Sequence, residues 1–525
     1  MTPPAPGPTP AAPASLTASL LRFALALLFV AGVGFYVHQG FGSVSTTLVV
    51  AAVIGVYMAM NIGANDVANN VGPIVGARVV TMGGAIAIAA VFEALGAIIA
   101  GGDVVTTIKG GIIDPARIAD PMTFVWLMMA ALLAGALWLN LATAMGAPVS
   151  TTHSIVGGVL GAGIAAAGWD IANWGTMGQI AASWIISPLF GGLIAAALLF
   201  GIKRSITYQS DLMEAARRMV PVLIALMAWA FSTYLLLKGL NQIIKVSFAV
   251  ALVSGLAAGT LVYFLSRRWI AHKSTRISND RAGVNRLFTV PLMFAAALLS
   301  FAHGSNDVAN AIGPLAAIYD VLGSGGVAEA RAAVPMWILV LGALGLSVGL
   351  ALYGPRLIRT VGSEITEIDP MRAYCISMAA AITVILASQL GLPISTTHVA
   401  IGAVFGVGFL REYLKANYDR IIEEIQQHHQ HQEAGHDAVE AFLLAFEAAT
   451  PSEKSRMLKE LKQQTRLGQG VISKQERKSL RKVHRQNLVK RSVMMRMIAA
   501  WIITVPASAA MAAVSYYAIR GAMLP

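Results

Sequence analysis

Residues 63–73 read Gly-Ala-Asn-Asp-Val-Ala-Asn-Asn-Val-Gly-Pro, and this stretch decides how the rest of the chain is interpreted. It places one carboxylate and three side-chain amides inside an otherwise apolar segment. A close copy, Gly-Ser-Asn-Asp-Val-Ala-Asn-Ala-Ile-Gly-Pro, begins 241 residues later and occupies residues 304–314. A polar motif of this length does not recur by chance, so the copy indicates an internal duplication.

A second pair of motifs supports the same duplication. Residues 148–153 read Pro-Val-Ser-Thr-Thr-His, and residues 393–398 read Pro-Ile-Ser-Thr-Thr-His, 245 residues later. The two pairs occur in the same order at nearly the same spacing. The chain is therefore interpreted as two homologous halves that build one polar site.

The composition places that site in a membrane protein. Of the 525 residues, 56% are hydrophobic and 12% are charged, whereas about 25% of the residues of a soluble domain are charged. The net charge of +12 raises the alternative of nucleic-acid binding, but the positive residues gather in short loops between apolar runs, as on the cytoplasmic side of membrane proteins. We therefore expect a lipid bilayer around the chain and no nucleic-acid partner. The single cysteine, Cys375, excludes an internal disulfide.

Apolar runs, basic loops and one polar tract suggest six parts. They are a tail with a candidate extra membrane helix (1–40), a first repeat (45–201), central spans with basic cytoplasmic loops (202–287), a second, inverted repeat (288–411), a basic helical cytoplasmic appendage (412–492) and a final membrane helix (493–525). Residues 20–37 fit either a retained helix or an uncleaved signal anchor.

The predicted fold is an all-α polytopic membrane protein with about 12–13 membrane segments. Counting crossings from the two basic loops gives the halves opposite directions, which is an inverted-topology repeat. Glycine and proline interrupt the Asn-Asp motifs, so we expect broken or re-entrant helices there. Irregular backbone at membrane depth is tolerated where it is buried or lines a cavity.

The two Asn-Asp motifs predict a cation site. An ionised carboxylate in hydrocarbon costs at least about 3 kcal/mol, so Asp66 and Asp307 need a cation or a proton. Carboxylate, amide and backbone carbonyl oxygens suit Na⁺ better than a soft metal. The alternative is a polar clamp between helices. The candidate cation ligands are Asn65, Asp66, Asn69, Asn306, Asp307 and Asn310.

The two Ser-Thr-Thr motifs predict an anion site. Proline followed by serine or threonine is typical of a helix start, where free backbone N–H groups and hydroxyl donors hold anions without a fixed cation. The alternative is that the hydroxyls bond back to helix carbonyls. The candidate anion ligands are Ser150, Thr151, Thr152, Ser395, Thr396 and Thr397.

Three further side chains are candidates for accessory roles. His153 and His398 close the Ser-Thr-Thr-His motifs, and they either titrate or donate to a bound ligand, or else orient the neighbouring hydroxyls. Glu93 is a lone carboxylate in an apolar run, with coupling or an interhelical hydrogen bond as its two alternatives. His303 has no counterpart in the first half, where Ile62 stands, so the sequence gives it no role.

These four motifs resemble the duplicated signatures of the inorganic phosphate transporter (Pit) family, over roughly residues 45–411. The resemblance implies a secondary active transporter that imports inorganic phosphate across the cytoplasmic (inner) membrane by symport with Na⁺ or H⁺. It assigns the Asn-Asp motifs to the cation and the Ser-Thr-Thr motifs to phosphate. It implies no catalytic residue and no cofactor apart from the coupling ion. Whether the chain acts as a homodimer stays open.

Several rival functions remain at this point. The chain could carry another oxyanion such as sulfate, or a metal–phosphate complex. A membrane-embedded hydrolase built on the two aspartates is a different class, but no nucleophile, base and orienting group are spaced as one unit. A receptor or scaffold is a further alternative, in which the appendage would be the segment that carries the function.

Overall fold

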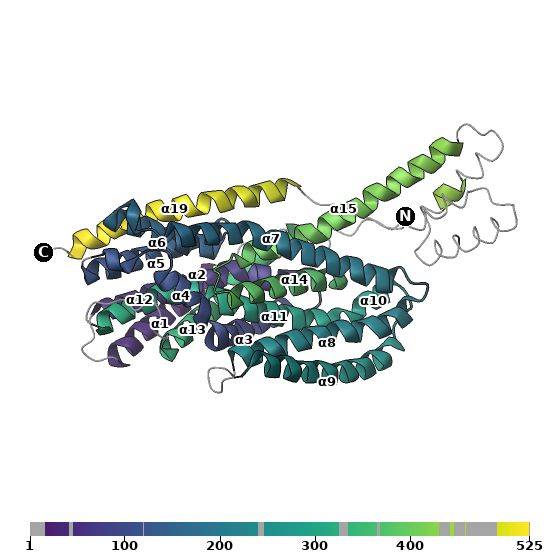
Figure 1. The fold of residues 1–525 in the computed structure, drawn as a ribbon, viewed down its shortest axis with the longest axis horizontal. Coiled ribbons are helices and arrows are strands. Elements are labelled where there is room, and N and C mark those ends of the chain that lie inside the picture. Colours follow the sequence, from purple (N-terminus) through teal and green to yellow (C-terminus); the bar gives the residue numbers. More distant parts are fainter. Residues whose placement is uncertain are drawn as a thin grey trace.

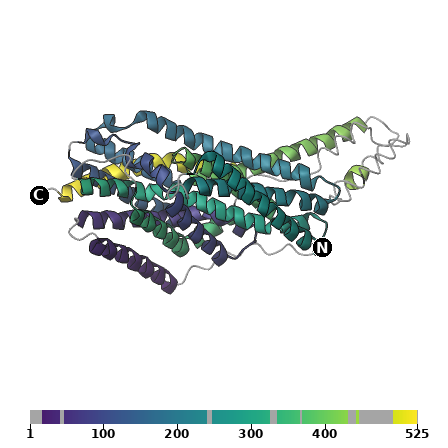
Figure 2. The same ribbon diagram turned by 60° about the horizontal axis from the view of Figure 1, so that its bottom comes forward.

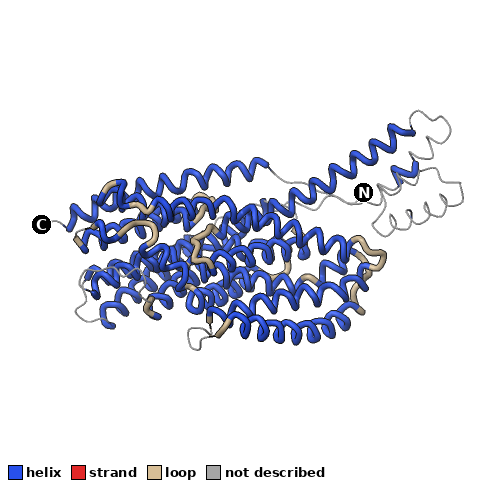
Figure 3. Tube along the Cα trace, viewed as in Figure 1, coloured by secondary structure: helices blue, strands red, loops and turns tan. Residues whose placement is uncertain are grey.

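The computed structural model of this protein is nearly all helical (Figures 1 and 3). It describes residues 16–40, 46–118, 120–239, 246–324, 334–364, 368–429, 441–445, 457 and 491–523. Most of the predicted appendage at 412–492 therefore lies outside the described residues, apart from the end of α15 and residues 441–445, 457 and 491–492.

The helices of the first half and the central region are α1 (Leu16–Gly40), α2 (Thr46–Gly76), α3 (Met82–Ala100), α4 (Gly102–Gly110), α5 (Pro121–Ala144), α6 (Thr151–Ala167), α7 (Trp174–Ile202), α8 (Leu212–Lys238) and α9 (Phe248–Ser274). Those that follow are α10 (Arg281–Leu287), α11 (Thr289–Asp307), α12 (Ala309–Ser324), α13 (Met336–Glu364), α14 (Pro370–Gln389), α15 (Thr396–His429) and α19 (Arg491–Met523). Most of them run along the long axis of the molecule (Figures 1 and 2).

Ten helices within the described ranges are long and apolar enough to cross a membrane, or eleven when the bent pair of α10 with residues 289–323 counts as one span. The expected number was about 12–13. The difference lies in two segments that the sequence suggested as spans. α6 has only 17 residues, and α15 passes from its apolar start into charged sequence after residue 410.

The expected break in the first Asn-Asp helix is wrong. α2 is continuous from Thr46 to Gly76 and carries Pro73 only in its last turn. In the second half the helix is interrupted at Val308 alone, between α11 and α12. Because a helix satisfies its own backbone hydrogen bonds, these polar motifs need no unwinding at membrane depth.

The irregular backbone lies instead at the tips of two helical hairpins. Helices α5 and α6 are joined through residues 145–150, and α14 and α15 through residues 390–395. Val149 and Ile394 in these tips are 2% and 1% exposed. Asp120 and Asp369 cap α5 and α14, each with a proline next in sequence, which is a strong helix start.

The two Asn-Asp motifs lie at the boundary between two apolar clusters. Ile62 belongs to one cluster and Val67 to the other, with Asp66 between them in sequence. Ala302 and Val308 are divided in the same way around Asp307. The polar groups therefore lie where the two apolar cores meet.

The last helix, α19, packs on the first-half hairpin in the same way as α7 packs on the second-half hairpin. A Cβ on Gly402 of α15 would lie 2.2 Å from the carbonyl oxygen of Pro188 in α7, and a Cβ on Gly157 of α6 would lie 2.7 Å from that of Val505 in α19. Thus α7 lies on the second-half hairpin and α19 on the first-half hairpin, along one side of the molecule (Figure 1).

A short repeat in sequence accompanies this packing. Trp-Ile-Ile occurs at residues 184–186 and again at 501–503, 317 residues later. The larger spacing arises because the tract after α15 is inserted before the last helix. The sequence signal for this pairing was present but was hidden by the insertion. The domain boundaries themselves stay predictions.

Glycines let two helix pairs cross at backbone contact. A Cβ on Gly349 of α13 would lie 1.9 Å from the carbonyl oxygen of Met60 in α2, and one on Gly63 would lie 2.1 Å from that of Leu346. Small residues at such crossings are typical of membrane helices. Gly63 therefore serves close packing rather than a helix break.

Helices α3 and α11 cross in the same way. A Cβ on Gly96 would lie 2.0 Å from the carbonyl oxygen of Phe301, and a Cβ on Gly304 would lie 2.0 Å from that of Glu93. This contact brings the backbone of Glu93 beside the residue that follows His303.

We predict that Gly349→Ala lowers thermal stability in detergent, because its methyl group meets the backbone of α2. The expected cost is about 1–3 kcal/mol. Gly178→Ala on α7 is the control, since nothing lies within 4 Å of a Cβ there, and alanine is the better helix former. Equal melting temperatures for Gly349→Ala and the wild type would contradict the close crossing.

Candidate functional site

Each hairpin tip is fastened to the Asn-Asp helix of its own half by an asparagine. In the first half, Asn65 Nδ2 donates to Thr143 Oγ1 at 2.9 Å and to the Ala147 carbonyl at 3.3 Å. Asn65 Oδ1 accepts from the backbone N–H of Val149 at 3.1 Å. One amide therefore holds both sides of the tip.

The second half repeats this arrangement. Asn306 Nδ2 donates to Ser388 Oγ at 2.9 Å and to the Leu392 carbonyl at 3.3 Å. Ser388 and Leu392 follow Thr143 and Ala147 by 245 residues, which is the spacing of the Ser-Thr-Thr motifs. The duplication read from the sequence is thus expressed as matching hydrogen bonds.

The first threonine of each Ser-Thr-Thr motif donates to the aspartate of the same half. Thr151 Oγ1 lies 2.9 Å from Asp66 Oδ2, and Thr396 Oγ1 lies 2.6 Å from Asp307 Oδ2. These four side chains are at most 2% exposed. The predicted anion and cation motifs are therefore in direct contact.

The second threonine of each motif connects the two halves. Asn69 Nδ2 donates to Thr397 Oγ1 at 2.8 Å, and Asn310 Nδ2 donates to Thr152 Oγ1 at 3.1 Å. The Thr397 hydroxyl lies 2.8 Å from Asp66 Oδ1. The site is thus one network made by both halves, as the sequence predicted.

The serines have a different position. Ser150 Oγ accepts from the backbone N–H of His153 at 3.1 Å, and Ser395 Oγ accepts from that of His398 at 3.2 Å. Both serines therefore cap the first turn of α6 and α15. The remaining N–H groups of those turns have no acceptor within the helix.

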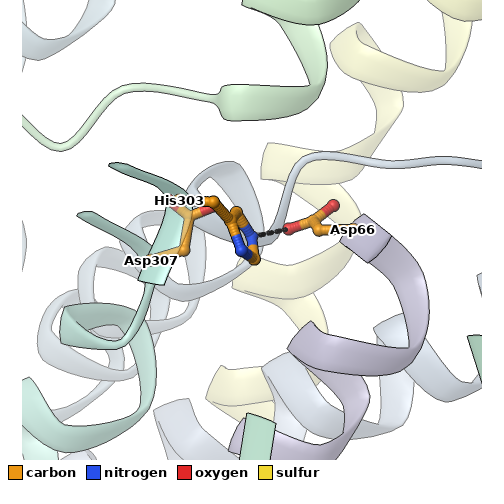
Figure 4. A group of neighbouring side chains, drawn as sticks. All are labelled: Asp66, His303 and Asp307. Atoms are coloured by element: carbon orange, nitrogen blue, oxygen red, sulfur yellow. Dashed lines mark ion pairs between the residues drawn. The ribbon is translucent and has the colours of Figure 1, made fainter. Parts of the chain in front are cut away.

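His303, to which the comparison of the two halves assigns no role, lies at the centre of the site. Its Nε2 lies 3.0 Å from Asp307 Oδ2 and 3.5 Å from Asp66 Oδ2, and its Nδ1 lies 3.4 Å from Glu93 Oε1. Figure 4 shows the ring between the two aspartates. The missed signal was the four-residue spacing of His303 and Asp307, which puts both on one helix face.

Glu93 completes this buried cluster. Its Oε1 accepts from Asn70 Nδ2 at 2.7 Å, and its side chain is fully buried. Neither Asp66, Asp307 nor Glu93 pairs with a lysine or arginine of the described chain. Three carboxylates thus share one imidazole, which has a single N–H when neutral. Further protons or a bound cation are needed to offset their charge.

Several buried oxygens of the second motif lack a donor among the described residues. They are Asn306 Oδ1, Asp307 Oδ1 and Asn310 Oδ1, with Glu93 Oε2 nearby in the cluster. Buried polar atoms are almost always paired. A hard cation such as Na⁺ takes ligands of this chemistry, so the residues fit the predicted cation. In the first motif, only Asn70 Oδ1 is buried without a donor among the described residues, and both oxygens of Asp66 already accept hydrogen bonds.

His153 and His398 lie outside this cluster. Their rings meet edge to face with centroids 4.5 Å apart. Each packs on a tryptophan, Trp184 of α7 at 3.8 Å and Trp501 of α19 at 3.7 Å. The two histidines therefore join the hairpin tips to the flanking helices, and an accessory role in transport stays a prediction.

Known proteins resemble this chain over most of its length. Residues 62–512 match the phosphate transporter family. A protein of Helicobacter pylori strain J99, called "Putative phosphate permease", is 51% identical over 506 residues, which is 95% of each chain. A "Putative phosphate permease" of Pyrococcus abyssi is 41% identical over 378 residues, covering 72% of this chain and 92% of its own.

A solved structure called "The sodium-dependent phosphate transporter" has a similar fold. Its TM-score is 0.73 at 30% identity, and the match covers 91% of this chain and 100% of that one. Together with the apolar helices, these likenesses identify a multi-pass membrane protein that transports phosphate and is not an enzyme. With 451 of its residues covered by one family match and a relative at half identity, this chain belongs to the phosphate transporter family.

Proposed function

We propose that this chain imports inorganic phosphate across the cytoplasmic membrane by symport with Na⁺ or H⁺, through alternating access to the central site. The observation that carries the proposal is the contact of each Ser-Thr-Thr motif with a buried aspartate. Phosphate binding and cation binding then share the same hydroxyl groups.

The cation belongs at the second-half motif. Asp307 Oδ1, Asn306 Oδ1 and Asn310 Oδ1 are buried acceptors without a donor in the described chain, and a cation supplies what they lack. Asp66, whose oxygens accept from Thr151, Thr397 and Asn69, contributes charge to the same cluster. Protons entering the cluster would serve the same purpose as Na⁺.

Phosphate belongs at the starts of α6 and α15. The threonines supply hydroxyl donors and the first helical turns supply backbone N–H groups, a set of donors that suits an anion. Without a cation, the carboxylates repel phosphate and also hold the threonine protons. With a cation bound, that repulsion falls and the anion can approach.

The threonine hydroxyls couple the two ligands. A hydroxyl has one hydrogen and two lone pairs. When Thr396 donates to Asp307, its hydrogen is not available to phosphate. A cation at Asp307 can take a lone pair of the same oxygen and leave the hydrogen free for phosphate. Each ligand thereby favours the other, as reciprocal linkage requires.

Alternating access fits a site made by both halves. The contacts Asn69–Thr397 and Asn310–Thr152 cross between the halves, so a relative movement of the halves alters them first. Rocking of one repeat against the other around a midplane site is the common behaviour of such folds. The inverted orientation of the halves stays part of this proposal.

We predict that Asp307→Asn and Asp66→Asn reduce cation-driven uptake of labelled phosphate into proteoliposomes. The expected loss in kcat/KM is roughly ten- to a hundredfold, from a lost charged interaction. Uptake is measured separately under an imposed Na⁺ gradient and an imposed proton gradient, which identifies the coupling ion. Asp170→Asn, at an exposed residue, is the control for the same chemical change. Normal transport by both site variants would refute the cation assignment.

We predict that Thr396→Val raises the KM for phosphate and weakens cation dependence together, because one hydroxyl serves both ligands. The expected change is roughly tenfold in each constant. Thr396→Ser keeps the hydroxyl and should retain most activity. A change in the phosphate KM alone, with cation dependence intact, would show that the hydroxyl does not couple the two.

We predict that Glu93→Gln keeps the melting temperature but reduces cation-driven uptake. Glutamine still accepts from Asn70 but removes one charge from the cluster. Glu93→Leu should also unfold more easily, by about 1–3 kcal/mol, because it leaves the Asn70 amide unpaired. Wild-type uptake by Glu93→Gln would assign Glu93 a packing role only.

A further inference from the structure

A basic cavity opens at the end of α9 and is lined by none of the residues of the two motif pairs. Its volume is about 550 Å³, whereas one water molecule occupies about 30 Å³ of the liquid. It therefore has room for a group of many atoms. Its polar and aromatic lining comes from the end of α9, the following turn and the α10–α11 junction, through Trp269, His272, Lys273, Arg276, Arg286 and Thr289.

The lining is positive and contains no acidic side chain. Lys273 Nζ lies 4.7 Å from the centre of the Trp269 ring, so its position is already restrained by a cation–π contact. Neither Arg276 nor Arg286 forms an ion pair with an acid of the described chain. The cavity thus offers several cations to one anionic ligand.

Asp280, the one acid between Arg276 and Arg286 in sequence, has another partner. Asp280 caps α10 by accepting from the Gly283 N–H at 2.6 Å. That backbone hydrogen bond, with further help from the positive charge of Arg286, holds the pKa of Asp280 below its ordinary value. Asp280 offsets part of the Arg286 charge but does not line the cavity.

The cavity lies where a lipid-facing helix turns basic. α9 packs chiefly on α8 and forms the edge of the bundle (Figures 1 and 2). Leu261, Phe264 and Leu265 are 62%, 55% and 57% exposed, and Trp269 follows one turn later. Tryptophan and basic residues just beyond an apolar stretch are typical of the headgroup level of a bilayer. The sequence places this loop on the cytoplasmic side.

We propose that this cavity binds the phosphate headgroup of an anionic phospholipid from the cytoplasmic leaflet. Arg276 and Arg286 face the phosphate from two sides, and Lys273 adds a third charge. The acyl chains lie along the apolar surface of α9 at Leu261 and Phe264. Basic pockets at helix ends on the cytoplasmic side are suited to such headgroups.

A bound lipid would connect α9 with the start of α11. Arg276 follows α9 directly, whereas Arg286 and Thr289 belong to α10 and α11. α10 and the helix that follows it meet at an angle of 44°, and α11 continues to His303 and Asp307. The lipid therefore stabilises the junction that leads into the central site.

The test uses the full chain in nanodiscs of equal parts phosphatidylglycerol and phosphatidylcholine, followed by native mass spectrometry. We expect one retained phosphatidylglycerol. The double substitution R276Q and R286Q should weaken its retention roughly tenfold or more. The double substitution R267Q and R268Q removes the same charge from exposed α9 positions outside the cavity and should leave retention unchanged. If the first pair impairs folding, each single substitution is measured instead.

Two competitors identify the source of the bound phosphate. Inorganic phosphate and glycerol phosphate have no acyl chain, so millimolar amounts should not displace the lipid. Displacement by either, retention of phosphatidylcholine to the same extent, or equal loss in both double variants would overturn the proposal.

Discussion

The structure depends on the burial of three carboxylates around a single imidazole. Asp66, Asp307 and Glu93 are fully buried, and His303 is the one basic side chain of the described residues within ion-pair distance of them. Removing carboxylates from water is costly unless they are paired. The hydroxyls of Thr151, Thr396 and Thr397 and the amides of Asn69 and Asn70 supply the partners, and the glycine crossings bring their helices close enough to reach.

The scaffold is nearly two-fold, whereas the chemistry at its centre is not. Asn65 and Asn306 hold matching tips, and the threonines donate to matching aspartates. Yet His303 stands where the first half has Ile62, and three buried oxygens of the second motif lack a donor among the described residues, whereas the first motif has one, Asn70 Oδ1. The two-fold scaffold gives each half the same hairpin tip, followed by the same kind of helix start at α6 and α15. In the proposed function, this asymmetry assigns the cation to the second motif, while Asp66 of the first motif completes the hydrogen-bond network.

Much of this site follows from the sequence, because duplication forces equivalent motifs into equivalent places. The convergence of Asp66, Asp307 and the Ser-Thr-Thr motifs was predicted from that argument, and the network confirms their contact. The same argument missed His303, because a comparison of the two halves finds only residues that occur in both. Its helical spacing to Asp307 was the better guide.

Glycine was the second source of error. Gly63 reads as a helix breaker in sequence, but here it admits the backbone of α13, and only the neighbouring helix reveals this. The roles of the site residues, the coupling ion, a homodimer and the inner membrane are not fixed by hydrogen bonds, since each concerns a bound ligand, a second chain or a bilayer. They stay predictions.

Each of the two outer helices, α7 and α19, packs on the hairpin of the other half of the chain. α7 covers the hairpin of the second half, and α19 covers that of the first. Neither half, taken alone, holds the helix that shields its own tip. A half expressed alone would expose Gly157 or Gly402 to lipid. It could cover that glycine only with the outer helix of a second copy. The duplicated chain therefore resembles two fused copies that have exchanged their outer helices, α7 and α19.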